Sequence, residues 1–250
     1  MALEGMDNYI RRVELLRDKV PSFSEYPFSL PIIRELSGLE LHPKVTYFVG
    51  ENGTGKSTIL EAMATAYGFN PEGGTKNFKF SSMATHSQLH EYIRLVKGVR
   101  RPKDGFFLRA ESFYNVATNI DELDREAGWP RVIDSYGGQS LHQQSHGEAF
   151  LSLFLEKFRG EGVYILDEPE AALSPIRQMT MIARLHELVC QGSQFIIATH
   201  SPIIMAYPEA MIYEIREDIK RVRYEDTDHY KVMRDFLDNR GKMLDILMNQ

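Results

Sequence analysis

The sequence predicts an α/β fold with a mostly parallel sheet flanked by helices, and three segments of the chain predict it. A short β-rich run, residues 45–49, leads into a glycine-rich loop and then into residues 59–67, which have helical periodicity. Two further apolar runs, residues 163–166 and 195–198, are unbroken. Unbroken apolar runs suit the central strands of a parallel sheet that is covered on both faces.

The glycine-rich loop reads GENGTGKS and matches the phosphate-loop pattern G-x-x-x-x-G-K-[ST]. Its glycines let backbone N–H groups converge on phosphate oxygens, and the following helix N-terminus adds positive potential. We expect Lys56 to reach the β- and γ-phosphates and Ser57 to bind Mg²⁺. The sequence therefore predicts a P-loop NTPase whose nucleotide-binding residues are Gly50, Glu51, Asn52, Gly53, Thr54, Gly55, Lys56, Ser57 and Thr58.

Two acidic residues and a histidine follow the other apolar runs. Asp167 and Glu168 come directly after the first run, and His200 comes shortly after the second. In open α/β sheets, ligands bind beyond the carboxyl ends of the strands, so we expect these side chains beside the phosphate loop. Asp167 is expected to hold Mg²⁺ together with Ser57. Glu168 is expected to polarise the attacking water, with His200 contacting that water or the γ-phosphate as a second catalytic residue.

The segment Ser145, His146, Gly147 and Glu148 precedes an apolar run with helical spacing. Ser145 and Glu148 fit the S-x-x-E capping box, in which the two side chains satisfy free backbone N–H groups. Gly147 in a first helical turn lowers stability relative to alanine, so we expect some group to approach its backbone closely. A serine hydroxyl, a glycine N–H and a helix N-terminus also make an anion site. The residues leave the capping box and the phosphate contact as two open interpretations.

The order of these motifs resembles the ABC ATPase superfamily: the phosphate loop, then SHGE opening a helix, then ILDEPEAALSP, then ATHSP. The resemblance covers roughly residues 25–215 and looks closest to the branch of SMC proteins, RecF-like recombination ATPases and short predicted bacterial ATPases, including those described as AAA. It implies an ABC-ATPase-like fold with a helical lobe and an antiparallel β edge. It also implies Mg²⁺-dependent hydrolysis of ATP by an ATP-gated head-to-tail homodimer.

In this family a signature of the form L-S-G-G-Q reaches across the dimer to the γ-phosphate held by the other subunit. QSHGE occupies that place here, so the resemblance implies a cross-dimer role for Ser145, His146, Gly147 and Glu148. Ser145 matches the signature serine and Gly147 its second glycine. His146 replaces the first glycine and Glu148 the glutamine. On this interpretation the space at Gly147 serves the partner's γ-phosphate.

Three other positions of the family pattern, the Q-loop, the D-loop and the base-stacking aromatic residue, do not match it clearly. Glu111 would stand where the Q-loop glutamine is expected, and Ser174 stands where the D-loop usually has aspartate. The aromatic residue that stacks on the nucleotide base would be Tyr26 or Phe28, and the sequence does not choose between them.

Together, these motifs predict one ABC-type ATPase domain over residues 1–250. We expect a helix over residues 8–20 and strands before residue 48. Residues 70–145 should form an inserted connecting and helical lobe, too short for the coiled coil of an SMC protein. Residues 208–250 should add C-terminal strands and then helices.

Composition restricts the class of protein and its location. The formal net charge of −6 argues against a dominant nucleic-acid surface. Any such contact would need a local patch, and residues 97–103 are the candidate, although a solvated turn fits them better. The single cysteine fits a reducing compartment. No apolar run approaches the ~20 residues of a membrane helix, so we expect a cytoplasmic protein without a membrane segment.

Three functions therefore compete. The first is an ATPase whose homodimer closes and opens with hydrolysis, and which is not itself a transporter. The second is a slowly hydrolysing ATP-gated clamp or sensor that holds a nucleic-acid or protein partner. The third is the nucleotide-binding subunit of a transporter, ranked last because the chain lacks a clear Q-loop and L-S-G-G-Q.

Overall fold

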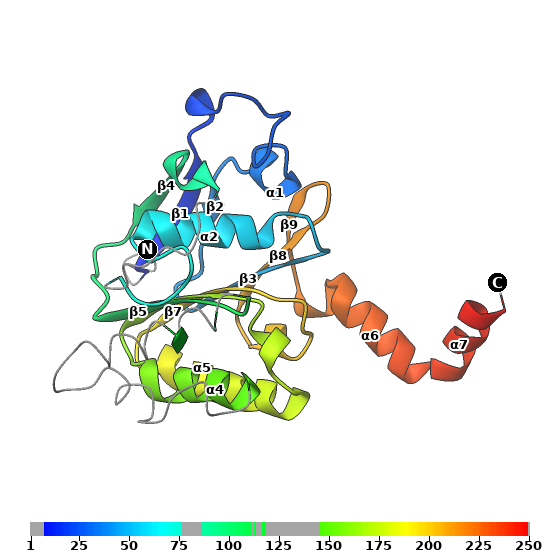
Figure 1. Cartoon of the computed structure of the whole chain (residues 1–250). Helices are drawn as coiled ribbons and strands as arrows, with labels where there is room; N and C mark the ends of the chain where they lie inside the picture. Colours follow the sequence, from blue (N-terminus) through cyan, green and yellow to red (C-terminus); the bar gives the residue numbers. More distant parts are fainter. Residues whose placement is uncertain (1–7, 77–86, 112, 114–116, 119–145, 250) are drawn as a thin grey trace, which may run out of the picture.

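The computed structural model describes residues 8–76, 87–111, 113, 117–118 and 146–249. Within this part of the chain, six strands form a main sheet and three strands form a smaller one (Figure 1). The main sheet consists of β3 (Val45–Gly50), β5 (Asp104–Arg109), β6 (Gly162–Asp167), β7 (Gln194–Ala198), β8 (Met211–Ile215) and β9 (Ile219–Val222). The smaller sheet consists of β1 (Ile10–Leu15), β2 (Leu39–Glu40) and β4 (Ile93–Lys97).

The main sheet is mostly parallel, in the order β5-β6-β7-β3-β8-β9. All neighbours in it pair in parallel except β8 and β9, which form an antiparallel edge. The smaller sheet is antiparallel, in the order β2-β1-β4. The predicted α/β class with a mostly parallel sheet and an antiparallel edge is confirmed. The carboxyl ends of β3, β6 and β7 consequently meet at one edge of the sheet.

Helices cover both faces of the main sheet (Figure 1). One face carries α2 (Lys56–Tyr67), with the short α1 (Pro31–Arg34) at its start. The other face carries α4 (His146–Ser152) and α5 (Pro175–Cys190), and a π-helical turn, Leu153–Lys157, continues α4. Short 3₁₀ turns connect the larger elements, at Arg17–Lys19, Gln88–Glu91, Pro169–Ala172, Ile204–Ala206 and Tyr224–Asp226.

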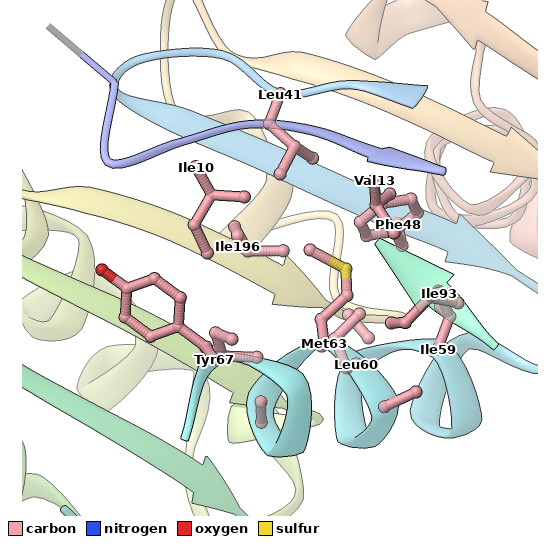
Figure 2. Close-up of a cluster of buried hydrophobic side chains, with 14 of the residues drawn as sticks. Ile10, Val13, Leu41, Phe48, Ile59, Leu60, Met63, Tyr67, Ile93 and Ile196 are labelled. Carbon is pink, nitrogen blue, oxygen red and sulfur yellow. The ribbon is translucent and has the colours of Figure 1, made fainter. Parts of the chain in front are cut away.

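The pleat of β3 serves both hydrophobic cores. Tyr47 belongs to the cluster on the side of α4 and α5, whereas its neighbour Phe48 belongs to the cluster around α2. This is the alternation expected of a strand with two covered faces. Figure 2 shows the second cluster, in which α2 turns its apolar face toward the strands. That predicted face is confirmed, since its members are all buried: Ile59, Leu60, Met63, Ala64 and Tyr67.

The helix predicted over residues 8–20 is wrong, because residues 10–15 form strand β1. Ile10 and Val13 are both fully buried at a spacing of three residues, which imitates helical periodicity. The register of β1 against β4 shifts between Ile10 and Arg12. A bulge of this kind inserts an extra residue and breaks the alternation of a strand. The bulge therefore explains why the spacing of buried residues in this strand predicted a helix.

In the span 70–145, predicted as a connecting and helical lobe, the described residues include two strands as well as the 3₁₀ turn Gln88–Glu91, and the lobe itself stays a prediction. Residues 93–97 pair with β1 as β4, and residues 104–109 pair with β6 as β5. Their sequences, IRLVK and DGFFLR, are rich in the β-branched and aromatic residues that strands favour. Most of the remaining span, residues 119–145, lies outside the described residues.

The C-terminal helices leave the body of the molecule. Helices α6 (Asp228–Asp238) and α7 (Arg240–Met248) extend away from the sheets as an arm (Figure 1). The strands and helices predicted for residues 208–250 are thus present. Several large apolar side chains of this C-terminal arm are exposed: Val232, Met233, Leu237, Ile246, Leu247 and Met248. In the described part of the chain, no helix has the length and apolar character needed to cross a membrane.

Candidate functional site

The loop between β3 and α2 depends on its glycines. Gly50, Gly53 and Gly55 have φ angles of 145°, 81° and 96°, in the range that favours glycine. A Cβ atom at Gly50 would lie 2.3 Å from the carbonyl oxygen of Ile215, and one at Gly55 would lie 2.7 Å from Cγ2 of Ile32. The loop is therefore fixed in shape by its own backbone and by close packing against two neighbouring segments.

Lys56 lies over this loop. Its Nζ donates hydrogen bonds of 2.8 Å to the carbonyl oxygens of Gly50 and Glu51. The residue is 4% exposed. Burial lowers the pKa of Lys56, while the carboxylates of Glu168 and Asp167 act to raise it. Because a lysine ammonium has three N–H donors, these two bonds leave one donor for another acceptor.

Ser57 and Asp167 meet at the carboxyl end of β6. The Ser57 hydroxyl donates a 2.9 Å hydrogen bond to Oδ1 of Asp167, which is buried. Burial raises the pKa of Asp167 to about 7, against the lowering effects of Arg109 and of the Ser57 hydrogen bond. A hydroxyl and a carboxylate are the oxygen ligands that Mg²⁺ prefers. The described residues contain no cluster of three or more His, Cys, Asp or Glu able to hold a metal, and Mg²⁺ at such a site is usually completed by waters and substrate phosphates.

Arg109 connects several carboxylates at this edge. It pairs with Asp167 in the register of β5 and β6, and its Nε lies 3.5 Å from Oδ2 of that residue. Its Nη1 donates to Glu61 over 2.7 Å, and its Nη2 lies 3.2 Å from the exposed Glu111. Arg109 thereby links the predicted Q-loop residue to the predicted metal ligand. Arg109 was not predicted from the sequence, although it ends an apolar run just as Asp167 does.

The two predicted catalytic residues are brought together. Glu168 has φ 50° and ψ 52°, which is uncommon for a residue other than glycine. Its N–H donates to the carbonyl of Ala198 over 3.0 Å, and its Oε1 lies 3.3 Å from Nε2 of His200. Burial, and then the charge of Lys56, lower the pKa of His200, whereas Glu168 acts to raise it. A carboxylate and a largely neutral imidazole therefore share the carboxyl ends of β6 and β7.

A second acid that the sequence analysis did not select fixes this arrangement. Glu170 accepts hydrogen bonds from the backbone N–H of His200 over 2.5 Å and from Oγ1 of Thr199 over 2.8 Å. Burial raises the pKa of Glu170. The turn after β6 thus holds the loop after β7 by a side chain. No spacing rule distinguishes Glu170 from a surface acid, so the sequence carried no signal for this role.

The family follows from the sequence as a whole. A family model described as an AAA domain matches residues 28–158, which is more than half of the chain. The chain belongs to this AAA domain family. It is a P-loop ATPase of the ABC type, a family that binds and hydrolyses ATP.

Named relatives of this AAA domain protein are ATP-binding proteins. The cytochrome c biogenesis ATP-binding export protein CcmA of Legionella pneumophila is 27% identical over 189 residues, which are 73% of this chain and 87% of that protein. The energy-coupling factor transporter ATP-binding protein EcfA2 of Methanospirillum hungatei is 26% identical, over 74% of this chain and 49% of that protein. A solved ATP-binding cassette of an ABC transporter, in its ADP conformation, has the same fold. It matches with a TM-score of 0.52 at 17% identity, over 96% of this chain and 99% of that chain.

The helix at the place of the ABC signature contacts the turn that follows β6. A Cβ atom at Gly147 would lie 2.5 Å from the carbonyl oxygen of Ala172 and 2.6 Å from Nη1 of Arg177. Nη2 of Arg177 donates to Oε1 of Glu148 over 3.1 Å. The close approach that the sequence predicted at Gly147 therefore comes from this chain itself. A contact of Gly147 with a phosphate of the partner subunit stays a prediction.

The rest of the signature is only partly described. Ser145 lies outside the described residues, so neither the capping box nor a cross-dimer contact is tested there. His146 begins α4. Ser174 is the N-cap residue of α5 but makes no side-chain capping hydrogen bond. The D-loop position thus opens a helix directly beside the signature helix of this ABC-type ATPase.

Burial distinguishes between Tyr26 and Phe28, the two aromatic residues predicted as candidates for stacking on the nucleotide base. Phe28 is 5% exposed and packs edge-on against Tyr92 with ring centroids 4.9 Å apart, whereas Tyr26 is 66% exposed. A core ring has no free face on which a base could stack. Tyr26 therefore stays as the candidate for base stacking.

The basic patch at residues 97–103 is engaged with an acidic residue. Lys103 and Arg100 lie 2.5 Å and 3.6 Å from the carboxylate of Glu161. These pairs support the interpretation of the patch as a solvated turn.

Proposed function

We propose that this ABC-type ATPase hydrolyses ATP with Mg²⁺ and works in the cytoplasm as an ATP-gated head-to-tail homodimer. We propose further that residues 1–250 form a single domain and that the chain is not itself a transporter. The observation that carries the proposal is the Ser57–Asp167 hydrogen bond of 2.9 Å. It puts the hydroxyl of the phosphate loop and the acid that ends β6 at one point, beside Lys56 and Glu168.

The phosphate loop is proposed to bind the nucleotide through residues 50–58. Its backbone N–H groups and the N-terminus of α2 would receive the phosphates, with Lys56 adding the charge for the β- and γ-phosphates. Ser57 and Asp167 would hold Mg²⁺, and their oxygen ligands fit that ion. A bound Mg²⁺ would neutralise charge on the phosphate oxygens. Tyr26 is proposed to stack on the base.

Glu168 and His200 are proposed to carry the hydrolytic step. The Glu168 carboxylate would accept a proton from the attacking water as its general base. His200 would contact the γ-phosphate or that water through Nε2, the ring nitrogen that faces Glu168 at 3.3 Å. Their strand-end position beside Lys56 supports these roles. Glu111 is proposed for the Q-loop, where Arg109 links it to Asp167.

Ser145, His146, Gly147 and Glu148 are proposed as the signature that meets the partner's ATP. The contact of Gly147 with Ala172 supports a modified form of this idea. The glycine would keep α4 against the turn after β6, and Ser145 with the helix N-terminus would face the partner. Dimer closure would then bring two incomplete sites together.

One alternative has specific support from the relatives, and experiments separate it and a second alternative from the first proposal. The transporter alternative gains from the relatives, since CcmA is named as an export protein and EcfA2 as part of a transporter. A transporter subunit should co-purify with a membrane protein, which an extraction of the tagged chain with detergent would reveal.

The clamp alternative predicts slow turnover that rises or falls when nucleic acid or a protein partner is added. Steady-state ATPase rates with and without DNA or RNA separate it from the first proposal.

The deciding experiment is sedimentation of Glu168→Gln with ATP and Mg²⁺. We expect a dimer in this background and a monomer when Ser145→Arg is added, while ATP binding to the phosphate loop persists. A monomer in both would refute the head-to-tail model. A dimer in both would favour the capping box. Ser145→Ala in the wild-type chain should then cost about 0.5–2 kcal/mol of stability and leave the ATPase rate of folded protein unchanged.

A further inference from the structure

His200 touches a histidine of the C-terminal arm. Nδ1 of His200 lies 3.1 Å from Nε2 of His229, and the two ring centroids are 5.2 Å apart at an interplanar angle of 58°. His229 is the second residue of α6. Both rings line the same cavity of about 620 Å³, together with Met243 and Leu247 of the arm and Glu51 of the phosphate loop. The arm therefore reaches the hydrolytic end of the nucleotide site.

The base of α6 is fixed to the main sheet. The N–H of Asp228 donates to Oε1 of Glu214 over 2.8 Å, and Glu214 is a buried residue of β8. Arg216 bonds both carboxylates, at 2.8 Å from Glu214 and 2.6 Å from Asp228. Thr227 caps the helix by accepting from the N–H of Tyr230. These contacts place His229 firmly beside His200, even though most of the arm is exposed.

The hydrogen bond between the two rings needs one N–H and one lone pair, because a neutral imidazole has a single N–H. If Nδ1 of His200 donated, its Nε2 would carry a lone pair only 3.3 Å from the carboxylate of Glu168. Two acceptors at that distance repel each other. The reverse arrangement puts the proton of His200 on Nε2, where it faces Glu168, and leaves Nδ1 to accept from Nε2–H of His229.

We propose that His229 is a positioning residue that holds His200 in its Nε2–H tautomer and orients that N–H toward the γ-phosphate end of the site. The ring nitrogens of a histidine are distinct, and the hydrogen bond at one sets the state of the other. Nδ1 of His229 and Nε2 of His200 have no hydrogen-bond partner in the part of the chain that the structure describes, so the Nε2–H of His200 is available to the γ-phosphate or the attacking water. The inference rests on the proposed role of His200 for its effect on hydrolysis, but the tautomer itself is independent of that role.

The test is ¹⁵N NMR of histidine-labelled protein at neutral pH, without nucleotide, in which His200→Ala identifies the His200 signals. We expect the wild-type His200 to show a protonated Nε2 and a bare Nδ1. His229→Ala should redistribute the proton between the two nitrogens, and His229→Gln should restore the wild-type pattern because its amide N–H can donate in the same direction. His186→Gln is the matched control, since this histidine of α5 bonds Tyr207 rather than His200, and it should change nothing at His200.

Kinetics give the second measurement. His229→Ala should lower kcat by about 5–10-fold, the value of one hydrogen bond, with ATP affinity changed less than about twofold. His229→Gln should recover most of the rate. Unchanged His200 signals in His229→Ala would overturn the inference whatever the rate. A redistributed proton with an unchanged rate, together with full activity of His200→Ala, would instead uphold the tautomer and refute the proposed role of His200.

Discussion

The phosphate loop and the corner formed by Glu168, His200 and His229 lie at the same edge of the main sheet, but different parts of the chain hold them. The two ends of the phosphate loop pack against the core, where Cβ atoms at Gly50 and Gly55 would clash with β8 and with Ile32, while the residues between them, 51–53, are exposed. The corner depends on side-chain contacts between segments far apart in sequence. Glu170 holds the loop of His200, and the exposed arm supplies His229.

This difference separates nucleotide binding from hydrolysis. Regions with dense buried contacts open only with global unfolding, whereas exposed elements open at lower free energy. The phosphate loop, which we call the binding half of the site, should therefore persist whenever the protein is folded. Glu168 and His200, which we call the hydrolytic half, should respond to any movement of the C-terminal arm.

Lys56→Ala gives the largest expected effect and breaks the binding half alone. ATP affinity should fall by about 10³-fold, because the loop loses its positive charge, one charge-assisted hydrogen bond to the phosphates, and the two bonds by which Lys56 holds the carbonyls of Gly50 and Glu51. Calorimetric titration with ATP measures this. Lys44→Ala is the control, since Lys44 pairs with Glu209 on the surface, and its affinity should match the wild type. Equal affinities for both variants would remove the phosphate-loop assignment.

Glu168→Gln breaks the hydrolytic half alone. Turnover should fall by about 10²-fold or more if Glu168 is the general base, with ATP affinity nearly unchanged. His200→Ala should slow hydrolysis less, by about 10-fold. Single-turnover assays with labelled ATP compare the three proteins. Full activity of Glu168→Gln would place the base elsewhere, with His200 the next candidate.

Asp167→Asn tests, through the pH dependence of the free energy of unfolding, whether burial raises the pKa of Asp167. Burial raises the pKa of Asp167 from an ordinary 3.8 to about 7, so the folded state keeps the proton that the unfolded state releases first. The free energy of unfolding therefore falls as pH rises from about 4 to about 7, by up to about 4 kcal/mol. Urea unfolding without nucleotide or metal should show Asp167→Asn more stable than wild type near pH 8. That gap should shrink near pH 5, and a gap that is equal at both would contradict the raised pKa.

Gly147→Ala has the smallest expected effect and tests the contact of α4 with the turn after β6. The added methyl group would press on the carbonyl of Ala172 and on Arg177, at a cost of about 1–3 kcal/mol. Gly241→Ala in α7 is the matched control, because a Cβ there meets nothing within 4 Å, and it should be neutral or slightly stabilising. Thermal unfolding compares the two, and similar midpoints would show that Gly147 is not crowded.

Features defined by short sequence motifs could be predicted from the sequence, whereas features that depend on contacts between residues far apart in the chain could not. The phosphate loop, the acids that end β6 and the histidine after β7 follow from short patterns whose context is a strand and a turn. Strand β1 was mistaken for a helix because its bulge, which sets the spacing of Ile10 and Val13, becomes visible only against β4. The crowding of Gly147 was predicted, but its source, Ala172, was not. His229 carries no pattern at all, since its importance comes from folding next to His200.

The position of β3 in the sheet has a consequence for biosynthesis. Its neighbours on both sides are β7 and β8, which lie at residues 194–215, whereas β3 itself ends at residue 50. A growing chain on the ribosome presents β3 early and cannot pair it until those later strands emerge. Pairing across so long a stretch also slows folding. The nucleotide site therefore forms only after residues 194–215 have been made, so ATP binding by a nascent chain would mark the pairing of β3 with β7 and β8.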